Sequence, residues 1–266
     1  TMELKRPLFI DEVEENDKNN DKKCNIKRNL LIGVAITFTI AIIGLCIWLS
    51  KTYEPQDIAK AALISDENME VKTNDYISFT PKNIKATKGF ILYPGAKVEP
   101  KSYAPFCRDI SEKGYEVIIL DMPFNIALLG QKEAEKVMKD YSDITHWVIG
   151  GHSLGGVAAS NFAAKNNIVD GVVLLASYPT NDKLKNMGKE VLSIWGSKDG
   201  VVNFKELIKS REKLPEDTTY VEVEGANHSQ FGDYGIQKGD NEALITSKEQ
   251  MDVTYKNIVK FLEGIN

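Results

Sequence analysis

The sequence predicts an α/β fold, in which a mostly parallel sheet carries helices on both faces and follows one transmembrane helix. Three observations support this. From residue 75 onward, apolar runs rich in β-branched residues alternate with segments of helical pattern, as in chained βαβ units. Runs such as 115–123 and 171–179 are apolar at consecutive positions, which is typical of strands buried on both faces. Residues 30–49 carry no charge at all.

Composition divides the chain into four segments. Residues 1–29 are polar and rich in charge, so we expect a disordered cytoplasmic tail. Residues 30–49, at helical rise, match the thickness of a hydrocarbon core of about 30 Å and are predicted to form the transmembrane helix. Residues 50–74 are expected to be a stalk or linker with a short helix near "PQDIAKAALI", and residues 75–266 a folded domain.

The apolar segment is predicted to be an uncleaved signal anchor. It is longer than the apolar region of a signal peptide, and no small-x-small cleavage site follows it. Positive charge gathers just before it, at Lys22, Lys23, Lys27 and Arg28. In the twenty residues after it only Lys51 and Lys60 are basic. The positive-inside rule therefore predicts a single-pass protein of the cell membrane, with its N-terminus in the cytoplasm and its large domain outside.

The elements of the domain follow from the pattern. Strands are expected at 76–79, 89–95, 115–123, 146–153, 171–179, 190–197 and 219–229. Helices are expected at 101–113, 130–143, 154–166, 203–213 and 248–263. Because ligands bind beyond the carboxyl ends of the strands in such sheets, functional residues are expected just after each strand.

One serine lies at such a strand end among glycines. Ser153 follows the apolar run 146–151 within Gly151-His152-Ser153-Leu154-Gly155, a G-x-S-x-G pattern. On a sharp strand-to-helix turn the serine hydroxyl is exposed above the sheet, and the flanking glycines avoid clashes with the strand and the helix. Neither the G-x-G-x-x-G dinucleotide pattern nor the Gly-Lys-Ser/Thr end of a P-loop fits this stretch.

A serine nucleophile needs a base and an acid that orients the base. His228, in "GANHSQFG" after the last expected strand, is the histidine that follows Ser153 in the chain. The order Ser, acid, His places the acid between them. Asp199, after the strand that ends near residue 197, is the favoured candidate, with Asp182 as the alternative.

Further residues are expected to complete the site. The backbone N–H of Leu154 is the expected first oxyanion donor, and Ala96, or alternatively Gly95, the second. The loop after the expected base is long enough to form a wall of the cleft, and Phe231 and Tyr234 on it are the candidate substrate contacts. Residues 180–189 are too few to fold as a cap domain, so the cleft is expected to be open and to prefer short acyl esters.

Four stretches together resemble a known family: "YPGAKVEPKSYAP", "GGHSLGG", "GSKDGVVN" and "GANHSQFGDYG". They resemble serine hydrolases of the α/β-hydrolase fold over residues 75–266, and are most similar to the compact dienelactone-hydrolase-like (carboxymethylenebutenolidase-like) group. The resemblance implies hydrolysis of a small-molecule carboxylic ester at a Ser-Asp-His triad, without a cofactor. Dienelactone hydrolases use cysteine where this chain has Ser153, so a general serine carboxylesterase fits better.

Composition also excludes some functions and leaves others open. A net charge of −5 and the lack of a basic stripe argue against nucleic-acid binding. The three cysteines and three histidines show no ligand spacing, so no metal site is expected.

Two alternatives to the esterase remain. An acyltransferase or thioesterase would use the same triad, and a non-catalytic binding module could use the same scaffold. The sequence does not specify the natural substrate or the oligomeric state.

Overall fold

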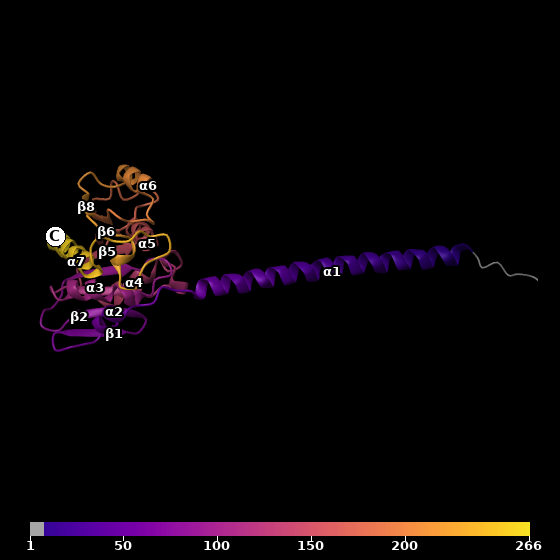
Figure 1. The fold of residues 1–266 in the computed structure, drawn as a ribbon, viewed down its shortest axis with the longest axis horizontal. Coiled ribbons are helices and arrows are strands. Elements are labelled where there is room, and N and C mark those ends of the chain that lie inside the picture. The colour runs from indigo at the N-terminus through magenta and orange to yellow at the C-terminus, as the bar shows by residue number, and fades with distance from the viewer. Residues whose placement is uncertain (1–7) are drawn as a thin grey trace, which may run out of the picture. The chain divides into compact units, whose positions relative to one another are not determined.

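The computed structural model describes residues 8–266, and for residues 8–24, 26 and 48–50 it describes the backbone alone. The chain forms two compact units, divided between Lys51 and Thr52 (Figure 1). The first unit holds one long helix, and the second holds a sheet with its helices.

The helix of the first unit, α1, spans Leu8–Ser50. Its part Lys27–Ile47 is long and apolar enough to cross a membrane, and none of that part is buried. The helix also covers residues 8–29, where the sequence predicts a disordered tail; residues 1–7 of that tail lie outside the described part of the chain. No proline or glycine occurs between residues 8 and 32, so a helix that forms in the apolar segment can extend toward the N-terminus without a breaker.

Residues 52–74 belong to the second unit, which corrects the expectation of a stalk. Helix α2 (Asp57–Ala62) buries Ala59 completely. Strand β1 (Met69–Thr73) pairs antiparallel with β2 (Tyr76–Pro81). The strand escaped prediction because only its first residue is buried, so its sequence lacks the apolar run of an interior strand.

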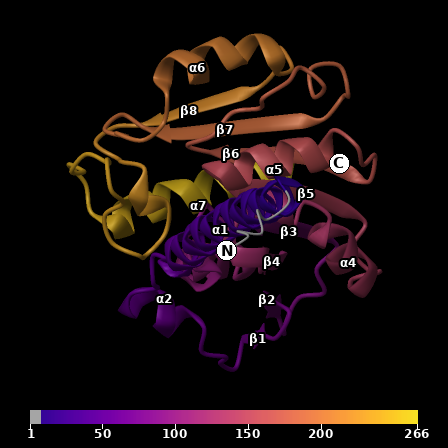
Figure 2. The ribbon, with the colours of Figure 1, turned by 90° about the vertical axis from the view of Figure 1, so that its right-hand side faces the viewer.

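The sheet has eight strands in the order β1-β2-β4-β3-β5-β6-β7-β8, which Figure 2 shows from β1 at the bottom to β8 at the top. The remaining strands are β3 (Lys88–Tyr93), β4 (Glu116–Leu120), β5 (His146–His152), β6 (Val169–Leu175), β7 (Glu190–Gly196) and β8 (Thr219–Val223). Strands β3 to β8 pair in parallel, whereas β1 and β2 are antiparallel. The predicted mostly parallel sheet is therefore confirmed.

Two apolar layers cover the sheet, one on each face. The main helices are α3 (Ala104–Ser111), α4 (Glu133–Asp140), α5 (Leu154–Ala163), α6 (Phe204–Lys209) and α7 (Ser247–Gly264). Alternate residues of β3 face opposite layers: Phe90 and Leu92 lie in the layer with α3 and α7, and Ile91 and Tyr93 lie in the layer with α4 and α5. The described residues 176–189, between β6 and β7, form turns and no helix, so no cap domain is inserted there.

Candidate active site

Ser153 lies between β5 and α5 in a strained backbone conformation, with φ 52° and ψ −121°. A positive φ is uncommon for a residue with a side chain and costs on the order of 1–3 kcal/mol. Neighbouring bonds hold the turn: Ser153 N–H donates to the Leu175 carbonyl at 2.9 Å, and the Ser177 hydroxyl donates to the Ser153 carbonyl at 2.6 Å. This geometry is that of a nucleophile elbow.

The flanking glycines permit the turn because nothing larger fits. A Cβ on Gly155 would lie 2.1 Å from the Tyr93 carbonyl oxygen, and one on Gly151 would lie 2.2 Å from the Gly155 carbonyl carbon. Both neighbours are backbone atoms, which cannot move aside without distorting β3 or α5. The sequence predicted that side chains at these two positions would clash with the strand and the helix, and the structure shows those clashes.

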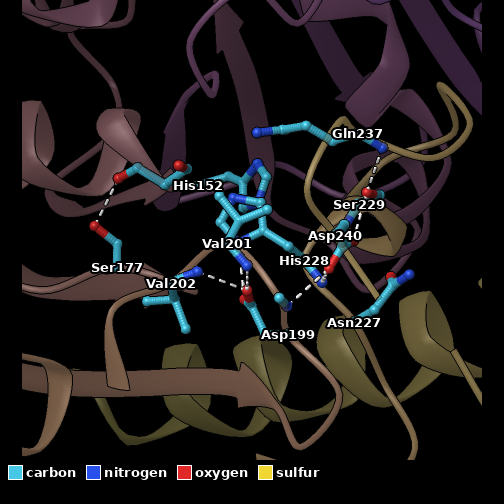
Figure 3. Close-up of polar contacts among 12 residues, drawn as sticks. His152, Ser177, Asp199, Val201, Val202, Asn227, His228, Ser229, Gln237 and Asp240 are labelled. Atoms are coloured by element: carbon cyan, nitrogen blue, oxygen red, sulfur yellow. Dashed lines mark hydrogen bonds and ion pairs between the residues drawn. The ribbon is translucent and has the colours of Figure 1, made fainter. Parts of the chain in front are cut away.

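His228 and Asp199 form a buried pair (Figure 3). The distance between His228 Nδ1 and Asp199 Oδ2 is 2.8 Å, and the two residues are 1% and 4% exposed. The other carboxylate oxygen, Oδ1, accepts N–H bonds from Val201 at 2.8 Å and Val202 at 2.7 Å. Asp182, the alternative acid, is exposed. Of the two candidates, the structure brings Asp199 to the histidine.

The second ring nitrogen of His228, Nε2, is not occupied by a hydrogen bond to any described residue. Among the described residues, Nε2 of His228 is buried and has no hydrogen-bond partner, and no bond joins it to the Ser153 hydroxyl. Bonds between a base and a nucleophile are often long before substrate binds. The turn and His228 are nevertheless neighbours, since the ring of His152, the residue before Ser153, has its centroid 4.5 Å from that of His228.

Two backbone amides above the sheet lack partners. In the loop after β3, Gly95 N–H donates to the Tyr103 hydroxyl at 2.9 Å, and Lys97 N–H donates to the Asn125 carbonyl at 2.8 Å. Within the described residues, the Ala96 N–H between them has no partner, and neither has the N–H of Leu154, the first residue of α5. A free N–H can stabilise a developing oxyanion, whereas the N–H of Gly95 is already bound.

His152 and Tyr103 contribute to the site although the sequence analysis did not select them. His152 is completely buried, and its Nδ1 lies 2.9 Å from the Tyr103 hydroxyl. Because that hydroxyl accepts the Gly95 N–H, its own proton is donated to Nδ1. Burial and the neighbouring His228 hold the pKa of His152 well below 6.5, so the ring is neutral. These hydrogen bonds join the segment after β3 to the end of β5, and no local pattern in the sequence marks them.

Asp240 is a further residue that local pattern does not reveal. Its Oδ1 accepts N–H bonds from Gly200 at 3.0 Å and from His228 at 3.3 Å. Its Oδ2 accepts the N–H of Ser229 at 2.7 Å and the Ser229 hydroxyl at 2.5 Å. One carboxylate thus fastens the loop that carries the histidine to the turn that carries Asp199 (Figure 3).

Phe231 and Tyr234 do not form an open wall, which corrects the sequence-based expectation. Phe231 is 0% exposed, and its ring packs 5.5 Å from that of His152. Tyr234 is 5% exposed and packs against the rings of Tyr53 and Tyr103. Both side chains belong to the core beneath the site, because the loop after His228 folds inward. They offer a substrate almost no accessible surface in this structure.

Comparison with known proteins agrees with this architecture. A family model described as "Alpha/beta hydrolase family" matches residues 89–252, which is more than half of the chain. The chain belongs to the alpha/beta hydrolase family. This confirms the resemblance stated from the sequence motifs. A search of curated proteins found no match.

Several solved structures share the fold. The esterase domain of a Rhodothermus marinus protein is 13% identical, with a TM-score of 0.54, covering 73% of this chain and 96% of that one. A monoglyceride lipase from Saccharomyces cerevisiae is 12% identical, with a TM-score of 0.56 and coverage of 80% and 98%. A protein described as a dienelactone hydrolase from Klebsiella pneumoniae is 15% identical, with a TM-score of 0.52 and coverage of 71% and 93%. At these identities the likeness concerns the fold.

The described residues offer no metal site. Among them, no group of three or more His, Cys, Asp or Glu side chains is arranged to hold a metal ion.

Proposed function

We propose that this protein is a membrane-anchored serine hydrolase that cleaves carboxylic esters at Ser153. The observation that carries the proposal is the buried pair of His228 and Asp199, whose free Nε2 is close to the strained turn of the serine. A buried histidine with one nitrogen bound to a carboxylate and the other free is the arrangement that a general base requires. Glycines that admit no side chain support the same conclusion.

The proposed reaction is acyl transfer to water. Asp199 accepts the Nδ1–H bond, which fixes the histidine tautomer that has its lone pair on Nε2. Nε2 takes the proton of Ser153 as the hydroxyl attacks the ester carbonyl, and then gives it to the leaving alcohol. The acyl-enzyme is hydrolysed by water that the same nitrogen activates. The N–H groups of Leu154 and Ala96 are proposed to stabilise both tetrahedral intermediates, each by roughly 3–4 kcal/mol.

The apolar part of α1 supports the membrane part of the proposal. Residues Lys27–Ile47 satisfy the length and composition of a single span. The basic residues before and at its start support an orientation with the N-terminus in the cytoplasm and the hydrolase domain outside. Protease added to intact cells should remove the domain and leave a short protected fragment. Complete protection of the domain would show the opposite orientation.

The esterase activity is tested with the full chain in detergent and 4-methylumbelliferyl acetate as substrate. Wild type should release the fluorophore with saturation kinetics, and Ser153→Ala should lose nearly all turnover while keeping its melting temperature, because the hydroxyl packs against little. A matched control is Ser142→Ala, on the turn before β5, which should retain full activity. Wild-type inactivity toward a panel of short esters would refute the proposal.

A further inference from the structure

The segment that follows the apolar helix is bound directly to the loops of the active site. Tyr53 N–H donates to the Lys97 carbonyl at 2.7 Å, and Glu99 N–H donates to the Tyr53 carbonyl at 3.0 Å. These bonds join Tyr53 to the loop that holds the proposed oxyanion donor. The Tyr53 hydroxyl accepts the N–H of Lys238 at 3.2 Å, on the loop that follows the proposed base. Tyr53 therefore connects both loops at one point.

The chain between the span and this point is short. The apolar segment predicted to span the membrane ends at residue 49, and the chain is fixed to the domain at Tyr53. Four residues at no more than about 3.6 Å each reach about 14 Å. Tyr53, and with it the residues of both loops that are bonded to it, is therefore tethered to the span by a connection no longer than that. A site at the amino ends of the parallel strands would not be held near the membrane by this tether.

Exposed apolar side chains gather on the loop after β4, which is bonded to the loop after β3 that Tyr53 contacts. Asn125 accepts the Lys97 N–H through its carbonyl at 2.8 Å and donates from Nδ2 to Glu99 at 2.8 Å. On this loop the apolar rim, defined as Phe124, Leu128 and Leu129, is exposed by 65%, 38% and 60%.

The backbone of the rim is also unusual. Phe124 has φ 55°, a left-handed conformation that bulky residues rarely adopt. The fold thus holds a large aromatic side chain in a strained and exposed position beside the site. Strain of this kind persists where the surrounding structure enforces it, and it is concentrated at functional positions.

We propose that this face of the domain lies on the bilayer that holds the apolar helix, and that the ester cleaved at Ser153 belongs to a lipid of that bilayer. The inference rests on the proposed function, since it names the substrate class of the same site. A short tether keeps the rim near the lipid surface at high effective concentration, so even a weak apolar contact suffices to dock it.

A bilayer substrate also accounts for the lack of an acyl-binding wall. The loop residues expected to form such a wall, Phe231 and Tyr234, are buried in the core. If the substrate is a lipid, its acyl chains can remain in the hydrocarbon region while the ester group at the interface enters the site. The enzyme then needs no acyl pocket of its own.

The test uses the full chain reconstituted in phosphatidylcholine vesicles and two esters with the same leaving group. 4-Methylumbelliferyl oleate is incorporated in the bilayer, and 4-methylumbelliferyl acetate is dissolved in the water. One variant, Phe124→Ser/Leu129→Ser, makes the rim polar, and another inserts a Gly/Ser linker of about 12 residues between Lys51 and Thr52.

The matched control is Ile84→Ser/Ile168→Ser. These isoleucines are 53% and 54% exposed. They precede β3 and β6, so they lie at the amino ends of the parallel strands, away from the active-site loops at the carboxyl ends. The ratio of the oleate rate to the acetate rate should fall by at least about tenfold in the rim and linker variants, since both reduce the effective concentration at the surface. The control should keep the wild-type ratio.

The outcomes separate the two proposals. An equal ratio in wild type, rim variant and linker variant would overturn the bilayer inference, and so would a wild type that cleaves the acetate but not the oleate. Failure of wild type to cleave either ester would instead refute the esterase function on which the inference depends. Loss of the acetate activity in the rim variant alone would show that this variant is misfolded. The oleate-to-acetate ratio of the linker variant then tests the bilayer inference by itself.

Discussion

Replacement of Asp199 by asparagine should abolish most of the activity through the histidine tautomer. Oδ1 of Asp199 accepts two backbone N–H bonds, at 2.8 and 2.7 Å, and only an oxygen can take that place. The asparagine must therefore turn its NH₂ group toward His228. That group donates to Nδ1, so the imidazole proton moves to Nε2, and Nε2 can no longer accept the proton of the nucleophile.

The size of the effect follows from this geometry. In the serine protease triad, the same change of tautomer lowers kcat about ten-thousand-fold. At about 1.4 kcal/mol for each factor of ten, this corresponds to roughly 5 kcal/mol of transition-state free energy. The fold should tolerate the change, because both N–H bonds to the side-chain oxygen remain.

The assay compares Asp199→Asn with Asp182→Asn by kcat on 4-methylumbelliferyl acetate, with melting temperature as the control for folding. Asp182 is exposed, so its variant should retain wild-type turnover. Similar losses in the two variants, or a larger loss at Asp182, would show that the reasoning about the acid is wrong.

Three further predictions use other parts of the molecule. Gly155→Ala should yield little folded protein or a large loss of melting temperature, because its Cβ would lie 2.1 Å from a carbonyl oxygen of β3; a normally folded and active variant would contradict this. With p-nitrophenyl esters from acetate to palmitate, presented in detergent without a bilayer, kcat/KM should not rise steadily with chain length, although each buried methylene could contribute roughly 0.8 kcal/mol; a steady rise would reveal an acyl tunnel. Burial raises the pKa of Glu116 to about 7 from the ordinary 4.5, so the folded state holds a proton that the unfolded chain releases, and stability falls as pH rises between these values. Glu116→Gln should remove that part of the slope of melting temperature against pH, and an unchanged slope would refute it.

The positions of the strands, and of the residues that directly follow them, could be predicted from the sequence. Apolar runs, continuous or alternating, predicted β2 to β8, and the expectation that functional residues follow parallel strands led to Ser153, Asp199 and His228 as candidates. The choice between Asp199 and Asp182 required coordinates, because both follow a strand and only the folded loop shows which carboxylate meets the histidine.

Other features depended on contacts that no local pattern encodes. Strand β1 is short and polar at the sheet edge, so its pairing with β2 was not visible. Phe231 and Tyr234 are aromatic residues on a long loop, and sequence alone cannot tell whether such a loop folds outward or into the core. The bonds of Asp240 and of Tyr53 join residues far apart in the chain, and a lone aspartate or tyrosine carries no signal of that kind.

The most direct test of the central claim is the position of covalent modification by a fluorophosphonate probe. The full chain is labelled, digested with trypsin, and the adduct is located by mass spectrometry. We expect a single adduct within the tryptic peptide 140–165, on Ser153, and no labelling of Ser153→Ala. An adduct on another residue, or labelling of the alanine variant at the wild-type rate, would contradict it.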